Sequence, residues 1–112
     1  MKVGIIRCMQ TEDYCPGTAD FNIIKKRAGA FKEVKEGETI EIIGFTNCGG
    51  CPGKKALLRA KMLIEKGADT IALASCISKG TPIGYACPFA EQIQSMIEKK
   101  LQGKIKLLTY TH

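Results

Sequence analysis

The chain has 112 residues, enough to build one hydrophobic core but too few for two domains. Hydrophobic residues make up 45% and charged residues 25%, an ordinary balance for a folded globular protein. The formal net charge is +6, but the lysines are scattered and no basic-aromatic motif of an RNA-binding module accompanies them. We therefore expect one domain over residues 1–112 and disfavour a nucleic-acid partner.

The apolar runs are short, about six to eight residues at most, so none can cross a membrane. The first residues, from Met1 to Arg7, are basic and apolar like the start of a signal peptide. A cysteine follows this arginine too early, and no small-residue cleavage site appears. We expect an internal strand here, a cytoplasmic protein and no membrane partner.

Short apolar runs alternate with segments of helical periodicity along the chain. Strands are expected at 3–8, 39–45, 70–75 and 104–110. The intervening helices are expected around Phe21, Ile24, Ala28 and Phe31 with Asp20 as N-cap, from Ala56 to Ile64 with Gly67 after it, and from Pro88 to Leu101 with Gly103 after it. The longest irregular piece, residues 77–86, is the expected place for a lid or site.

Strands that alternate with helices predict an α/β fold with a parallel sheet and right-handed crossovers. Four strands and three helices suit a small open three-layer sandwich with a four-stranded parallel sheet and helices on both faces. By analogy with flavodoxin-like sheets, we expect the strand order 2-1-3-4.

The cysteine content is the unusual feature of the composition. The chain has six cysteines: Cys8, Cys15, Cys48, Cys51, Cys76 and Cys87. In a small secreted protein they would predict three disulfides. In a reducing cytoplasm, clustered thiols are more often metal ligands or redox groups, and we expect that here.

These cysteines fall where parallel strands end. Cys8 and Cys76 close the first and third expected strands, and Cys48 and Cys51 follow the second. The remaining candidates, Cys15, Cys87 and His112, lie in later parts of the loops or after the fourth strand. All of them should meet at the carboxyl edge, where open α/β sheets bind ligands near the reversal of strand order. Use of cysteine as a small buried hydrophobe could explain one or two of these positions, but not the set.

Three cysteines stand directly before a proline: Cys15, Cys51 and Cys87. Proline favours the first position of a helix, so Cys51 and Cys87 are expected to be N-caps. There the free amides and the helix dipole would lower the thiol pKa.

The segment Cys48-Gly49-Gly50-Cys51 is a Cys-x-x-Cys motif. Two cysteines at this spacing can converge on one metal ion or close a disulfide. The motif alone leaves both uses open.

With Cys-Gly-Gly-Cys in its centre, Arg7-Cys8 at the end of the first strand, a cysteine ending the third and a terminal Thr111-His112, the sequence resembles the CGGC domain family. The resemblance covers the whole chain and implies a single CGGC-type domain over residues 1–112. It also implies zinc binding, without a settled activity. By position, the family's pattern includes Cys8, Cys48, Cys51, Cys76, Cys87 and His112, with Cys15 added to them.

We expect a metal-binding protein that uses thiolates as ligands, with zinc as the first choice and a metal ion as the one predicted partner. The preferred ligands are Cys8, Cys48, Cys51 and Cys76, followed by Cys87 and His112. An iron–sulfur cluster is the alternative cofactor, and a thiol–disulfide oxidoreductase that uses Cys48 and Cys51 is the alternative function. A cysteine phosphatase is disfavoured because no arginine follows Cys8 or Cys76 in a phosphate-binding loop.

Overall fold

The computed structural model describes residues 1–112 and contains one parallel sheet of four strands. The strands are β1 (Lys2–Arg7), β2 (Glu41–Asn47), β3 (Thr70–Leu73) and β4 (Lys106–Leu108). Their order is β2-β1-β3-β4, and all three neighbouring pairs are parallel. The predicted α/β fold and strand order are confirmed.

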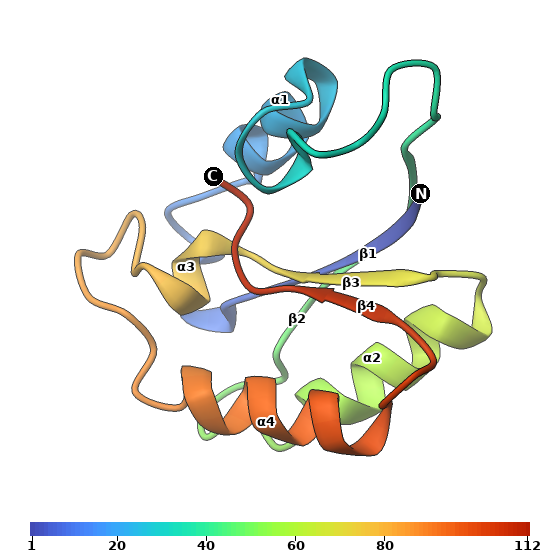
Figure 1. Cartoon of the computed structure of the whole chain (residues 1–112). Helices are drawn as coiled ribbons and strands as arrows, with labels where there is room; N and C mark the ends of the chain where they lie inside the picture. The colour runs from blue at the N-terminus through green and yellow to red at the C-terminus, as the bar shows by residue number, and fades with distance from the viewer.

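The helices are α1 (Thr18–Lys26), α2 (Ala56–Glu65), α3 (Ser75–Ser78) and α4 (Ala90–Lys100), with 3₁₀ turns η1 (Met9–Thr11) and η2 (Gly29–Phe31). The helix α1 covers one face of the sheet, and α2 and α4 cover the other (Figure 1). The predicted three layers are therefore present. None of the helices has the length and apolar character needed to cross a membrane.

The centre of the sheet forms the core because β1 and β3 are flanked on both sides by other strands. Every residue of β3 is buried, as are all residues of β1 after Lys2. Gly4 on β1 and Gly44 on β2 are paired in the register, and Leu63 of α2 lies directly over both. A Cβ at either glycine would come within 2.8 Å of a Leu63 methyl carbon. Glycine is thus needed here to let α2 approach the sheet.

The first helix is shorter than its apolar spacing predicts. It ends at Arg27, whose φ of 52° is left-handed, and Phe31 falls in the separate turn η2. The N-cap is Gly17, so the prediction of Asp20 as N-cap is wrong. Asp20 lies in the first turn of α1 and is buried.

The third strand also ends earlier than expected. It stops at Leu73, and the short helix α3 begins at Ser75. Cys76 is therefore on a helix rather than at the end of a strand. A four-residue helix is too short to show a period in the sequence, and its residues 75–77 are all buried, so it resembles a continued strand.

The prediction that Cys51 and Cys87 are N-caps is wrong. The N-cap of α2 is Lys55, because Gly53 between Pro52 and the helix has a left-handed φ of 87°. The N-cap of α4 is Phe89, and Cys87 lies in the turn before it. Both cysteines are in loops that lead to helices.

Candidate metal centre

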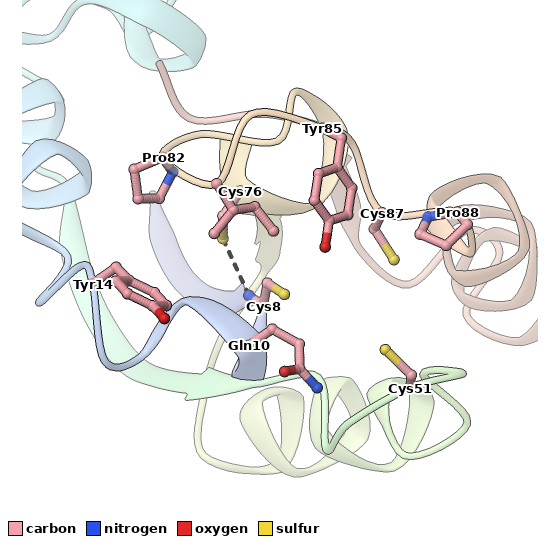
Figure 2. A pocket seen from close by; sticks show the side chains of 10 residues that line it. Cys8, Gln10, Tyr14, Cys51, Cys76, Pro82, Tyr85, Cys87 and Pro88 are labelled. Atoms are coloured by element: carbon pink, nitrogen blue, oxygen red, sulfur yellow. Dashed lines mark hydrogen bonds between the residues drawn. The ribbon is translucent and has the colours of Figure 1, made fainter.

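A cavity of about 770 Å³ opens at the carboxyl edge of the sheet. Cys8, Cys51, Cys76 and Cys87 line it, so four of the predicted site residues share one space (Figure 2). They come from four separate places: the position directly after β1, the loop after β2, the helix α3, and the loop before α4. The sheet edge therefore gathers thiols that are far apart in the chain.

Cys8 and Cys76 form the buried side of this cavity. The backbone N–H of Cys8 donates a hydrogen bond to the Cys76 sulfur, with an N–S distance of 3.1 Å. The two side chains are 7% and 9% exposed. Burial raises the pKa of both thiols, although the hydrogen bond from the Cys8 amide partly offsets this increase at Cys76. Both groups are therefore neutral thiols at neutral pH until something displaces the proton.

Cys48 lies beside Cys8, although it does not line the cavity. Burial raises the pKa of Cys8, and a charge on nearby Cys48 raises it further. The Cys48 amide donates to the carbonyl oxygen of Arg7 at 2.8 Å, which extends the β1–β2 pairing by one step. Cys48 is thus held against the end of β1.

Cys51 and Cys87 lie at the mouth of the cavity. Cys51 is exposed, Cys87 is half-buried, and their sulfur atoms point toward each other (Figure 2). The Cys87 sulfur accepts a hydrogen bond from the Phe89 amide at 3.4 Å. Burial nevertheless raises the pKa of Cys87, so the lowered value predicted from a helix N-terminus is wrong at this residue.

Cys15 and His112 lie away from this cavity, beside α1. The Cys15 sulfur accepts a hydrogen bond from the N-cap residue Gly17 at 3.4 Å. Its carbonyl oxygen accepts a hydrogen bond from the buried guanidinium of Arg7, which also lies over the Phe45 ring. His112 Nε2 is 3.7 Å from the Asp20 carboxylate. The structure brings neither residue to the thiol cavity.

The thiols are too far apart in this structure to share one ion. No group of three or more His, Cys, Asp or Glu side chains lies within metal-holding distance of a common point. Four thiols therefore line one cavity, but no three of them are close enough to bind the same ion.

Several residues of the cavity were not predicted from the sequence. Its remaining walls are Gln10, Tyr14, Pro82, Ile83, Tyr85 and Pro88. Tyr14 and Tyr85 are mostly exposed and stand at the rim. Pro82, Ile83 and Tyr85 belong to the irregular segment 77–86, which the sequence marks as a lid or site. No feature of the sequence singled out Tyr14 or Tyr85 as a site residue.

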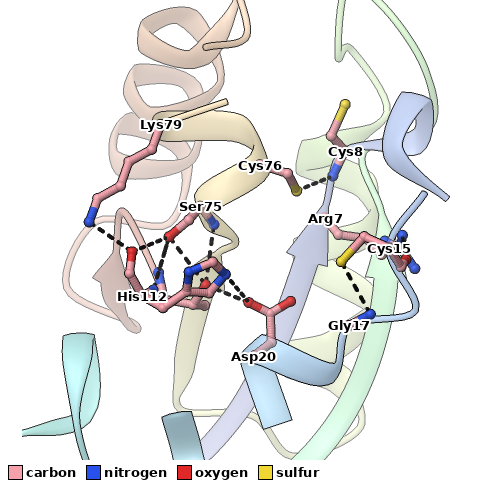
Figure 3. Close-up of polar contacts among 10 residues, drawn as sticks. Arg7, Cys8, Cys15, Gly17, Asp20, Ser75, Cys76, Lys79 and His112 are labelled. Atoms are coloured by element: carbon pink, nitrogen blue, oxygen red, sulfur yellow. Dashed lines mark hydrogen bonds and ion pairs between the residues drawn. The ribbon is translucent and has the colours of Figure 1, made fainter. Parts of the chain in front are cut away.

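A second polar cluster fixes the end of the chain beside α3. The hydroxyl of Thr111 donates to the Asp20 carboxylate at 2.5 Å, and the Thr111 amide donates to the Ser75 hydroxyl at 3.1 Å. Figure 3 shows the neighbouring His112 between Ser75 and Asp20. The Ser75 amide donates back to the Thr111 hydroxyl at 3.2 Å. Because Ser75 precedes Cys76, this cluster holds the helix that carries one of the buried thiols.

The CGGC domain family matches residues 2–112. Over 119 aligned residues the chain is 34% identical to Uncharacterized protein MJ0582 of Methanocaldococcus jannaschii, covering 99% of this chain and 88% of that protein. Uncharacterized protein MJ0766 of the same organism is 42% identical over 53 residues, 46% of this chain and 76% of that protein. No solved structure matches the chain. With its central Cys48-Gly49-Gly50-Cys51 segment and its full-length match, the chain belongs to the CGGC domain family.

Proposed function

We propose that the protein binds a thiophilic metal ion, zinc before others, through cysteine thiolates at the carboxyl edge of its sheet. The observation that carries this proposal is the cavity into which Cys8, Cys51, Cys76 and Cys87 all open. Cys48 lies next to Cys8 and completes the ligand candidates. Cys15 and His112 are not in the proposed set, because they lie beside α1.

The donor chemistry fits zinc. Thiolate sulfur is a preferred ligand of Zn²⁺, and structural zinc sites with four cysteines are common. The thiols of Cys8 and Cys76 are both buried, and the Cys76 sulfur accepts a hydrogen bond from the Cys8 backbone amide, so this side of the site is ordered before an ion arrives. A bound zinc ion would make these thiols release their protons, which offsets the effect of burial on their pKa.

Binding requires movement at the mouth of the cavity. Since no three donors share a common point, at least one cysteine must turn toward Cys8 and Cys76. Cys51 and Cys87 are suited to this, because both are in loops and neither is buried. We therefore place the fixed half of the site directly after β1 and on α3, and the mobile half on the two loops.

An iron–sulfur cluster is the second candidate. Clusters are held by converging cysteines, and the cavity of about 770 Å³ has more room than a single ion needs. A thioredoxin-like use of Cys48 and Cys51 has less support. In that arrangement the motif begins a helix, whereas here α2 begins only at Ala56.

Competition between the protein and a coloured chelator tests the proposal. Reduced, untagged protein kept free of oxygen should remove about one equivalent of zinc from the chelator, as a single four-ligand site requires. Cys48→Ser and Cys51→Ser should each lose most of this capacity while the circular dichroism spectrum is retained. Cys15→Ser is the matched control and should bind like the wild type. Stoichiometric zinc in both the Cys48 and Cys51 variants would contradict the proposal.

A further inference from the structure

Two cysteines face each other across the mouth of the cavity, and they are not the pair of the Cys-x-x-Cys motif. Cys51 reaches the mouth from the loop after β2, and Cys87 reaches it from the loop before α4 (Figure 2). Both line the cavity.

The motif partner Cys48 is directed elsewhere. It is only 6% exposed and lies against Cys8, whereas Cys51 is exposed. Gly49 and Gly50 between them have left-handed φ values of 83° and 96°, so the segment between the two cysteines is not a helical turn. Cys48 therefore belongs to the interior and Cys51 to the mouth.

We infer that Cys51 and Cys87 form a reversible disulfide by exchange with a low-molecular-weight disulfide, and that this closes the mouth of the cavity. The reaction itself needs only the two thiols. Its effect on metal content rests on the proposed function, since a disulfide between these cysteines would remove two candidate ligands at once.

The exchange proceeds in two displacements. The Cys51 thiolate attacks one sulfur of the small disulfide, that S–S bond breaks, and the first small thiol leaves with the proton that Cys51 lost to water. The Cys87 thiolate then attacks the Cys51 sulfur of the mixed disulfide and expels the second small thiol, which takes up the proton from Cys87. Two protein thiols are oxidised and one small disulfide is reduced to two thiols.

The order of the two steps follows from access. Cys51 is exposed and can meet a dissolved disulfide, while Cys87 is half-buried and bound to the Phe89 amide. Cys51 is thus the attacking residue and Cys87 the resolving residue.

Peptide mapping of metal-free, reduced protein after treatment with glutathione disulfide tests this inference. Cleavage after lysine places Cys48 and Cys51 on residues 36–54 and Cys87 on residues 80–99. The inference predicts a cross-link between these two peptides. A disulfide inside residues 36–54 as the main product would overturn it, as would unmodified thiols under conditions in which urea-unfolded protein reacts.

Single variants assign the cross-link. Cys48→Ser should form it as well as the wild type, whereas Cys87→Ser should stop at a glutathione adduct on Cys51. Loss of the cross-link in the Cys48 variant would show that Cys48 is a partner and would contradict the assignment. Because this mapping uses metal-free protein, its result does not depend on whether the protein binds zinc. In zinc-loaded protein, the same treatment should release zinc from the wild type.

Discussion

Thr111 connects the C-terminal segment to α1 and α3 in the polar cluster beside the site. Its side chain is fully buried, donates to Asp20 of α1 and accepts from the amide of Ser75 on α3. The carboxylate of Asp20 is itself 5% exposed and depends on this hydroxyl. Removing the hydroxyl would leave a buried charge with one fewer donor, which is more costly than losing an exposed hydrogen bond.

We predict that Thr111→Val lowers the free energy of unfolding by about 2–3 kcal/mol, the usual cost of a lost bond to a buried charged group. The measurement is urea denaturation of the metal-free protein. Thr109→Val is the matched control, because Thr109 is only half-buried and its hydroxyl makes no hydrogen bond to the protein. Equal effects of the two substitutions would show that the cluster does not stabilise the fold.

The buried thiols predict how stability depends on pH. Burial raises the pKa of Cys8 and Cys76 above the ordinary value of 9.0. Above that pH the unfolded chain has lost these protons while the folded chain still holds them. Because the folded state then binds more protons than the unfolded state, the free energy of unfolding decreases as the pH rises above 9.0.

The urea midpoint of metal-free protein should therefore fall between about pH 8 and pH 10, near the titration range of thiols. Cys76→Ala should fall less steeply over the same range, since one of the buried groups is gone. A midpoint that stays constant or rises over this range in the wild type would refute the assignment of neutral, buried thiols.

At the scale of elements, the turn between the Cys-x-x-Cys segment and α2 depends on Gly53. Its φ of 87° is left-handed, and a Cβ there would lie 2.5 Å from the Cδ1 atom of Ile93 on α4. Two costs would combine in any other residue: the left-handed backbone and the collision with a buried side chain. This glycine therefore sets both the start of α2 and the position of the loop that carries Cys51.

Gly53→Ala should destabilise the protein by about 2–5 kcal/mol, the sum of backbone strain and overpacking. Gly37→Ala is the control: its φ of 90° is equally left-handed, but nothing lies within 4 Å of the added carbon. It should cost only about 1–2 kcal/mol. Thermal or urea unfolding of both variants compares the two, and an equal loss would mean that Ile93 simply moves aside.

The same elements show how far the sequence could be used to predict the fold. Apolar runs such as that of β1 and the periodicity of α2 identify the strands and helices well, and their alternation predicts the parallel sheet. The strand order is expected only by analogy with flavodoxin-like sheets. The predictions fail where a few residues determine where a helix begins or ends. Arg27 ends α1 with a left-handed conformation that arginine seldom adopts, and α3 is too short for its period to be recognised.

At the scale of the whole molecule, the sequence predicts which residues reach the carboxyl edge but not where along that edge they lie. Cys8 lines the cavity, whereas Cys15 and His112 lie beside α1. Successive residues of a strand point to opposite faces, so the exit of each loop decides which side its cysteine reaches. That choice depends on contacts such as those of Arg7 and Asp20, which no spacing in the sequence reveals.

Elemental analysis of the protein as purified, without oxygen and without an affinity tag, tests the central claim most directly. The wild type and the variants Cys15→Ser and His112→Ala should each contain about one equivalent of zinc, as expected for one tetrahedral site. Cys8→Ser and Cys76→Ser should contain little, because they remove the fixed ligands of the cavity. Iron with sulfide in place of zinc would select the cluster. A wild type without metal, or equal zinc in all five proteins, would contradict a metal site at this edge.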